Sequence, residues 1–561
     1  MPAEPTIVTS PGVPQPPDAA GSARIGVDVR KFAWFRPLAG DYAYNFPNIA
    51  SLYAGNPSSP DAWRAVIARR QQQSHDGDAV AGVLAAQQQR RGAPPSARAA
   101  AARLAEPGVV AVVSGQQAGA FGGPLFTLLK AITALQLAKR TEAEHGVPCV
   151  PVFWVDAEDH DWDEVGSCTV LDDAHHPRTV TIPKPDGGGE QPVASLVLDE
   201  RIVGSIGELE AALSRTDFTD WVLAGVRTHY QPGAGMADAF ARWLETLLGP
   251  HGLVVFDSSD PAAKPLASAV FARELASPGR TAALATTAGD ALAARGHEPQ
   301  VTPNPDSVAL FHLGDGRRAI RRQGDRYLVG DTLFTAEALA EDAAAHPERL
   351  SPNVLLRPIV QDTLFPTICY VAGPSELAYL GQLGGVYEHF GLPMPLMYPR
   401  ASATIVDAAA LRFVTRYHVA LDELQKQDES ALNRLLHSQL PAEVEQSLGE
   451  ADENIRRTMQ RVIEAMPALD PTMAGAARTT LGRMEHELRT LQNKVIQAAK
   501  RRDETLRRQF TRAQTQFYPL GDPQERTLAV VFFLNRYGPA LVDRLMDQLP
   551  LDLGQHWIMT I

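Results

Sequence analysis

Four short segments of this 561-residue chain carry side chains that could do chemistry, and the densest is segment 156–164, DAEDHDWDE. Seven of its nine positions can titrate or bind a ligand. Crowded carboxylates raise one another's pKa and support a protonated histidine, which suits general acid–base catalysis with His160 between Asp159 and Asp161. Two other interpretations stay open: a divalent cation held by the carboxylate oxygens, and a solvated acidic loop.

The second segment is glycine-rich, SGQQAGAFGGP over residues 114–124. It lies between a buried apolar run and the start of a helical pattern, where open α/β sheets bind ligands and a helix N-terminus offers N–H groups to an anion. Its spacing is neither the dinucleotide fingerprint nor the P-loop. The glycines either cradle a ligand or simply permit a tight turn.

The remaining two segments combine arginine with polar residues. Arg357 either clamps a carboxylate or phosphate or pairs with Asp362, and Glu376 either faces a ligand or complements the start of a helix. Arg400 is followed by two hydroxyls, at Ser402 and Thr404, which either contact phosphate or cap the next helix.

Runs of β-branched and apolar residues must position these segments. Residues 109–113 and 149–155 read as strands buried on both faces, with a helix over 124–140 between them, so they form a βαβ unit. Further strands are expected at 253–256, 367–371 and 395–398. The sequence therefore predicts an α/β fold, a Rossmann-like parallel-sheet core over 23–405, with small β insertions near 168–205 and 298–336 that include strands at TVTIP and ASLVL.

The rest of the chain is predicted to be helical. Apolar residues recur at spacings of three and four through 406–517, which indicates an antiparallel coiled coil that turns near Pro467–Pro471. We expect residues 518–561 to form a helical segment that packs back on the body, and residues 1–22 to be a disordered tail.

Composition excludes several functions. A formal net charge of −13, from 52 Lys and Arg against 65 Asp and Glu, argues against a nucleic-acid coat. No apolar run approaches the roughly 20 residues that cross a bilayer, and no secretory leader is expected. Three scattered cysteines, Cys149, Cys168 and Cys369, favour a reducing cytoplasm.

Four long motifs in the same order resemble the bacterial bacillithiol biosynthesis cysteine-adding enzyme family. They are SGQQAGAFGGPLFTLLKAITALQLAK, VPVFWVDAEDHDWDEV, LRPIVQDTLFPTICYVAGPSELAYLGQL and MPLMYPRASATIV. The resemblance implies a Rossmann core with two connecting-peptide insertions and a coiled coil used for homodimerisation. It also implies a ligase that adds L-cysteine to glucosaminyl-malate in the last step of bacillithiol biosynthesis. ATP or another nucleotide is the expected activator, and no metal, nucleic acid or membrane is expected.

The plan is similar to class I aminoacyl-tRNA synthetases, but the chain lacks their HIGH and KMSKS motifs and any cysteine-rich zinc site. Carried over by resemblance, three groups of residues receive roles. Catalysis falls to His160, Asp159 and Asp161. Substrate binding falls to Arg357, Gln361, Asp362 and Glu376. Nucleotide or anion binding falls to Gly115, Gln116, Gln117, Gly119, Gly122, Arg400 and Ser402.

Two other functions compete with the ligase. One is a coiled-coil scaffold whose degenerate Rossmann core senses a nucleotide. The other is a metal-dependent hydrolase, such as a deacetylase of the same pathway, built on segment 156–164.

Overall fold

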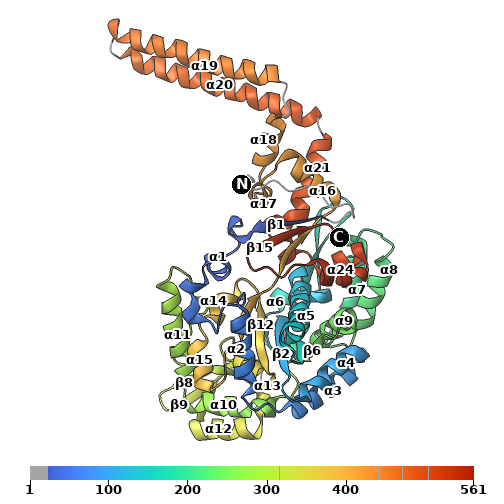
Figure 1. Cartoon of the computed structure of the whole chain (residues 1–561). Coiled ribbons are helices and arrows are strands. Elements are labelled where there is room, and N and C mark those ends of the chain that lie inside the picture. The colour runs from blue at the N-terminus through green and yellow to red at the C-terminus, as the bar shows by residue number, and fades with distance from the viewer. Residues whose placement is uncertain (1–22, 315, 439–441, 471, 503) are drawn as a thin grey trace, which may run out of the picture. The chain divides into compact units, whose positions relative to one another are not determined.

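The computed structural model describes residues 23–314, 316–438, 442–470, 472–502 and 504–561, which form two compact units (Figure 1). Of the described residues, one unit combines 23–405 with 523–559, and the other comprises 406–522. The expected tail at 1–22 and Pro471 of the expected turn lie outside the described residues.

The first unit is built on a five-stranded parallel sheet in the order β13-β12-β2-β3-β6. Its strands are β2 (Val110–Gln117), β3 (Cys149–Asp156), β6 (Val254–Asp257), β12 (Thr367–Ala372) and β13 (Leu396–Pro399). Numbered along the chain, this is the 3-2-1-4-5 order of a Rossmann sheet, and the order reverses between β2 and β12. The predicted Rossmann-like core is therefore confirmed.

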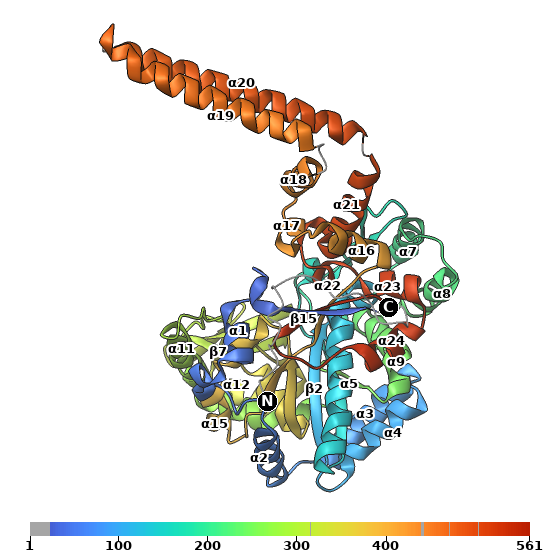
Figure 2. The same ribbon diagram turned by 45° about the horizontal axis from the view of Figure 1, so that its top comes forward.

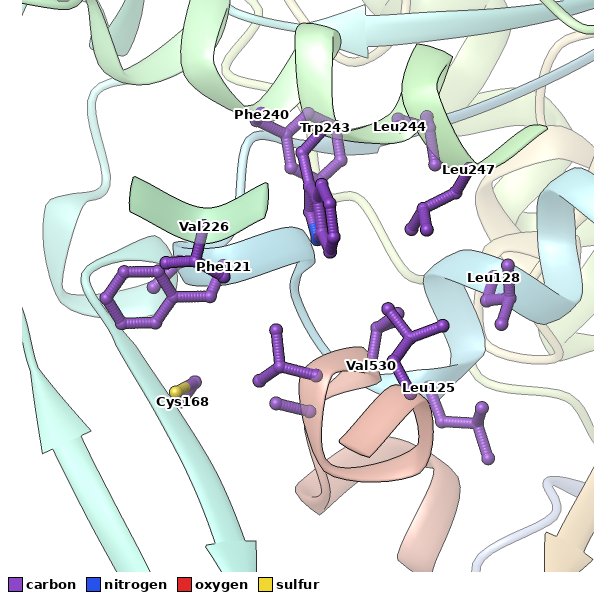
Figure 3. Packing of buried hydrophobic residues seen from close by; sticks show 14 of the residues in the cluster. Phe121, Leu125, Leu128, Cys168, Val226, Phe240, Trp243, Leu244, Leu247 and Val530 are labelled. Atoms are coloured by element: carbon purple, nitrogen blue, oxygen red, sulfur yellow. The ribbon is translucent and has the colours of Figure 1, made fainter. Parts of the chain in front are cut away.

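Apolar side chains cover both faces of this sheet. In β3, Phe153 and Val155 join one hydrophobic cluster, while Val152 and Trp154 join another, because successive residues of a strand point to opposite faces. Helix α5 (Leu125–His145) connects β2 to β3 and lies alongside the sheet (Figure 2). On its side of the sheet, Trp243 of α9 (Met236–Leu248) is buried near Phe121 and Val530 (Figure 3).

The first insertion contains one antiparallel hairpin, β4 (Ser167–Leu171) with β5 (Pro177–Thr181). The expected strand at ASLVL, residues 194–198, was wrong. This stretch begins with a short 3-10 helix, Val193–Ser195, because both the backbone N–H and the hydroxyl of Ser195 donate to the Pro192 carbonyl. Such local bonding by serine competes with a strand ladder.

The second insertion forms a separate antiparallel sheet in the order β10-β9-β8-β7-β11. Its strands are β7 (Ser307–Gly314), β8 (Gly316–Gln323), β9 (Arg326–Val329), β10 (Thr332–Thr335) and β11 (Leu350–Pro352).

Helices before and between the strands complete the unit. They are α1 (Pro37–Tyr44), α2 (Pro60–Gln71), α3 (Gly77–Arg91), α4 (Pro95–Ala102), α6 (Trp162–Val165), α7 (Arg201–Ala212), α8 (Thr219–His229), α10 (Ser268–Ala276), α11 (Arg280–Ala293), α12 (Ala336–Ala345), α13 (Arg357–Leu364), α14 (Glu376–Leu380) and α15 (Gly384–Phe390).

The C-terminal segment contributes a strand as well as the expected helices. Helices α22 (Gln524–Thr527), α23 (Val530–Tyr537) and α24 (Ala540–Gln548) precede β15 (Gln555–Met559). Strand β15 lies between β1 (Arg24–Asp28) and β14 (Ser402–Ile405) in a three-stranded sheet. The first and last strands of the described residues thus pair in one small sheet.

The second unit is helical. The antiparallel hairpin is confined to α19 (Ala442–Ala465) and α20 (Met473–Arg502), which lie side by side in both views (Figures 1 and 2). The antiparallel coiled coil was predicted over 406–517, and α19 and α20 are the long paired helices within these bounds. The flanking residues form α16 (Ala408–Tyr417), α17 (Leu421–Gln425), α18 (Ser430–Ser438) and α21 (Glu504–Phe517). Across the described part of the chain, no helix is both long and apolar enough to cross a membrane.

Candidate functional site

A pocket of about 640 Å³ opens at the carboxyl ends of β2, β3 and β12. This is where the strand order reverses, the position at which open α/β sheets bind ligands. Strand ends of the core supply Gln117, Asp156 and Tyr370, the second insertion supplies Arg317, and α22 supplies Arg526. Three parts of the chain that are distant in sequence therefore build one cavity.

A buried ion pair crosses the centre of the site. The Nζ of Lys130, on α5, lies 2.5 Å from Glu376 Oε2 and also donates to the Gly115 carbonyl at 2.9 Å. Burial lowers the pKa of Lys130. Burial alone would raise the pKa of Glu376, but Lys130 and the Gly373 N–H, at 2.5 Å, stabilise the carboxylate, so its pKa is lowered. Glu376 lines the pocket and is also engaged by the protein, and its role in substrate binding stays a prediction.

Arg357 faces the pocket without a carboxylate partner. It lies at the start of α13, is 8% exposed, and donates to Tyr379 Oη at 2.9 Å and Gln361 Oε1 at 3.1 Å. Its guanidinium also lies over the Tyr370 ring, 5.5 Å from the centroid. Among the described residues, no carboxylate oxygen lies within 4.0 Å of it. A buried guanidinium in that situation suits an anionic ligand, since buried charges are normally paired.

Gln361 and Asp362, which were expected to bind substrate, lie behind Arg357 and outside the pocket lining. Both are buried, and Gln361 donates to Asp362 Oδ1 at 2.9 Å. Burial raises the pKa of Asp362, whose Oδ2 accepts a hydrogen bond from Tyr387 at 2.5 Å. These two residues support Arg357 instead of touching a ligand, because α13 turns them into the protein.

The acidic segment divides between the pocket and the surface. Asp156, Asp159 and Glu164 line the pocket. The Gln117 amide donates to Asp159 at 2.6 Å and to Glu164 at 2.9 Å. Burial would raise the pKa of Asp159, but the amide of Gln117 and the backbone N–H of His160 lower it.

His160 and Asp161, two of the three residues expected to be catalytic, do not line the pocket. The His160 side chain is 44% exposed, with its Nδ1 3.3 Å from Asp159 Oδ1. Asp161 is exposed and caps α6, accepting a hydrogen bond from the Glu164 N–H at 3.2 Å. The direction of the chain after β3 places both at the edge of the site.

The glycine-rich segment does not offer the expected anion cradle. Residues 114–117 continue β2 as a strand. The Gly119 N–H donates to the Gln117 carbonyl at 2.9 Å, and the Gly122 N–H to Tyr230 Oη at 3.1 Å. Gly122 has a φ of 100°, a conformation that favours glycine, so the tight-turn interpretation explains it.

The N-terminus of α5 is also occupied by the chain itself. The Leu125 N–H donates to the Leu528 carbonyl at 2.9 Å, and the Val530 N–H donates back to Gly123. The returning C-terminal segment thus covers the helix end where a phosphate was expected. Of the five predicted residues in this segment, Gly115, Gln116 and Gln117 reach the pocket, and Gly119 and Gly122 do not.

Arg400 lines the pocket, but its charge is already neutralised. It forms two bonds to Glu525, at 2.6 and 3.0 Å, and both side chains are buried. Ser402 is buried beside them, bonded to Glu525 and to His556 Nδ1 at 2.7 Å, and does not line the pocket. The predicted phosphate contact at Ser402 is therefore wrong, because the hydroxyl belongs to the network that anchors β15.

Sequence reasoning assigned no role to five charged residues of the pocket: Lys130, Asp156, Glu164, Arg317 and Arg526. Asp156 was within the acidic segment but was passed over for His160. Lys130 had a detectable signal, since it is a lysine amid the apolar positions of α5. Arg317 and Arg526 had no signal in the sequence, because only the fold brings the second insertion and α22 to the carboxyl edge of the parallel sheet. Arg317 lies over the Phe311 ring at 3.9 Å and donates to the Pro352 carbonyl at 3.1 Å.

The described residues contain no group of three or more His, Cys, Asp or Glu side chains arranged to hold a metal ion. Glu158 of the acidic segment turns away and pairs with the buried Lys264. The hydrolase alternative therefore gains no donor set from this segment.

Comparisons with known proteins cover nearly the whole chain. A model described as "Bacillithiol biosynthesis BshC, N-terminal Rossmann-like domain" matches residues 27–401, and one described as "Bacillithiol biosynthesis BshC, C-terminal coiled-coil domain" matches residues 403–561. A "Putative cysteine ligase BshC" from Salinibacter ruber is 35% identical over 533 residues, 94% of this chain and 96% of the relative. Proteins of the same name from Koribacter versatilis and Chlorobaculum tepidum are 33% and 32% identical, over 78% and 80% of this chain and 82% of each relative.

Proposed function

The chain belongs to the bacillithiol biosynthesis BshC family, and we propose that it is a ligase that joins L-cysteine to glucosaminyl-malate in the last step of that pathway. The reaction forms an amide between the cysteine carboxyl and the sugar amine. The curated relatives carry the name of a cysteine ligase, which supports the reaction class. The two named substrates are our own assignment.

The observation that carries the substrate assignment is Arg357. Its buried guanidinium faces the pocket and has no carboxylate partner among the described residues. The malate group of the proposed substrate supplies carboxylates, and a guanidinium binds a carboxylate through two parallel hydrogen bonds. Arg526, an exposed cation on the same pocket, adds positive charge at its mouth. This local charge holds an anionic substrate although the whole chain is acidic.

Amide formation from a free carboxylate needs an activated carboxyl, and we propose a nucleoside triphosphate as its source. The segment 114–124 does not fit a phosphate-binding loop, because its inner N–H groups and the start of α5 are bonded within the protein. Arg526, an exposed cation of the pocket, is the group left to meet phosphate, because Arg357 is assigned to the malate carboxylate and Arg317 lies 3.9 Å from Asp159.

Reconstitution of the purified protein tests this function. Glucosaminyl-malate, cysteine and each nucleoside triphosphate in turn are mixed with the full chain, and the amide product and the nucleotide product are both measured. We expect the amide in at least one mixture, with one nucleotide consumed per amide formed. Absence of the amide from every mixture would overturn the assignment, and amide without nucleotide turnover would overturn the activation step.

We also propose that the chain forms a homodimer through the α19–α20 hairpin and acts in the cytoplasm. The hairpin leaves large apolar side chains exposed, including Leu469 at 86%, Met484 at 43% and Leu491 at 49%. Apolar surface of this kind favours association. All three cysteines are free and buried, which suits a reducing compartment.

A further inference from the structure

We infer that Asp156 binds the amine of the substrate and accepts its proton, a role that rests on the proposed amide-forming function. Asp156 is the last residue of β3, so its side chain lies at the carboxyl edge of the sheet and lines the pocket. Adjacent strand β2 pairs Gln117 with it in register. The central sheet therefore fixes the backbone of Asp156 and of its neighbour Gln117.

The lack of a partner distinguishes this carboxylate from the others in the pocket. Asp159 and Glu164 accept hydrogen bonds from Gln117, and Glu376 accepts them from Lys130 and Gly373. The Asp156 side chain shows no hydrogen bond, and no ion pair within 4.0 Å, with any residue that the structure describes, although the charges of Arg357 and Arg317 act on it. A carboxylate that lines a cavity and is left unpaired suits a cationic group of a ligand, just as the unpaired Arg357 suits an anionic one.

The surroundings of Asp156 favour a proton acceptor. Burial raises the pKa of its carboxyl, the nearby carboxylates of Asp159 and Glu158 raise it further, and the guanidinium groups of Arg357 and Arg317 oppose the rise. An acid whose pKa moves upward toward neutrality is a better base at the working pH than an ordinary aspartate. Two other carboxyls that line the pocket, Asp159 and Glu376, have lowered pKa values and are therefore weaker bases.

The two unpaired groups match the two ends of an amino-sugar malate. Arg357 meets a carboxylate, and Asp156 meets the ammonium. One proton passes from the ammonium nitrogen to an Oδ of Asp156, which frees the lone pair. That lone pair forms the new C–N bond to the carboxyl carbon of cysteine that the nucleoside triphosphate has activated. The bond from this carbon to its leaving group breaks with the electrons on that group, which departs with the second N–H proton.

Two other groups are less suited to this role. Lys130 is positively charged in its ion pair with Glu376 and repels an ammonium. His160 lies outside the pocket lining, with its ring 44% exposed. Neither faces the cavity as a free base.

The test measures binding and turnover separately in the full chain. The dissociation constants of glucosaminyl-malate and of its N-acetylated form, which carries no ammonium, are measured by calorimetry for the wild type and for Asp156→Asn. The matched control is Asp163→Asn, in the same segment but with a side chain 88% exposed. Because the Asp156 side chain makes no hydrogen bond to a described residue, we expect its variant to melt within a few degrees of the wild type.

We expect the wild type and Asp163→Asn to prefer the free amine by about tenfold or more, and Asp156→Asn to bind both ligands equally. Turnover by Asp156→Asn should fall by about 100-fold or more, the usual contribution of a positioned base. Equal binding by the wild type, or wild-type turnover by Asp156→Asn, would overturn the inference. If the wild type forms no amide at all, the proposed function fails instead.

A measurement on the wild type alone guards against misfolding of the variant. Its preference for the free amine should weaken as the pH falls and Asp156 gains a proton, since the amine stays charged. A preference that stays constant as the pH is lowered until the protein unfolds would overturn the inference even without the variant.

Discussion

The ammonium of Lys130 and the carboxylate of Glu376 lie 2.5 Å apart and join α5 to the start of α14. They meet beside the reversal point of the sheet, so this pair holds together the two halves of the fold where the ligand is proposed to bind. Tyr370 and Tyr379 both donate to the same carboxylate at 3.3 Å, and Tyr379 also holds Arg357. The pair therefore orders the site from within the pocket lining.

Glu376→Gln should lower the free energy of unfolding by about 3 kcal/mol, because it leaves the Lys130 ammonium buried without a counter-charge. Urea unfolding of the full chain at pH 7 measures this. The control is Glu388→Gln, an exposed glutamate of α15, which should change the free energy by less than about 0.5 kcal/mol. Equal free energies of unfolding for the two variants would show that the Lys130–Glu376 pair makes no net contribution to stability.

Arg357→Ala should raise the KM for glucosaminyl-malate by about 100-fold, since truncating a buried charged hydrogen-bonding partner of a ligand costs about 2–5 kcal/mol. Arg357→Lys should recover only part of the loss, because an ammonium cannot form the parallel pair of bonds. Tyr379→Phe removes only the hydroxyl that holds the guanidinium and should raise KM by about tenfold at most. Initial rates at varied glucosaminyl-malate concentration measure the KM of each variant and so check this ranking. An unchanged KM for cysteine in all three variants is the internal control.

The core of the fold could be predicted from the sequence because its strands are continuous apolar runs. Cys149–Asp156 and Thr367–Ala372 are buried strands, as expected. The pocket could be predicted only in part, because strand ends are visible in a sequence but side-chain direction is not. Gln361 and Arg357 both lie on α13, yet only Arg357 lines the pocket. Arg526 reaches the same cavity through tertiary contacts that no local pattern shows.

His160→Ala should retain turnover within about threefold of the wild type, whereas Asp156→Asn should not. The sequence favoured His160 because an unperturbed imidazole titrates near neutral pH, but the structure places its side chain, 44% exposed, outside the pocket lining. Parallel assays of the two variants decide between the two assignments. Loss of product in His160→Ala with an unchanged melting temperature would restore the histidine as the acid–base group.

His556→Gln should flatten the dependence of stability on pH between about pH 6.5 and pH 4. Burial lowers the pKa of His556 to about 4, although Glu525 opposes the shift. The unfolded chain therefore binds a proton in this window that the folded protein does not bind, so stability falls as the pH falls, by up to about 1.4 kcal/mol per pH unit. Urea unfolding at pH 6.5, 5.5 and 4.5 measures the slope.

The control for this slope is His176→Gln, whose side chain is 68% exposed, and its curve should parallel the wild type. Contributions from carboxylates that do not interact with His556 cancel when slopes are compared between variants. A His556→Gln curve parallel to the wild type would mean that the buried imidazole is not neutral in the folded protein.

Met484→Glu combined with Leu491→Glu should convert the proposed homodimer to a monomer. These residues lie seven positions apart on α20, so they share one stripe of the helix, and both are more than 40% exposed within the chain. The free-energy cost of burying four carboxylates in a two-fold interface is far larger than the stabilisation that the apolar contacts provide. Light scattering after size exclusion measures the mass, which should fall from about twice 60.6 kDa to 60.6 kDa.

Thr480→Glu with Asn493→Glu, at exposed polar positions of the same helix, adds the same charge and should leave the dimer intact. A dimer that survives the first pair would place the interface elsewhere.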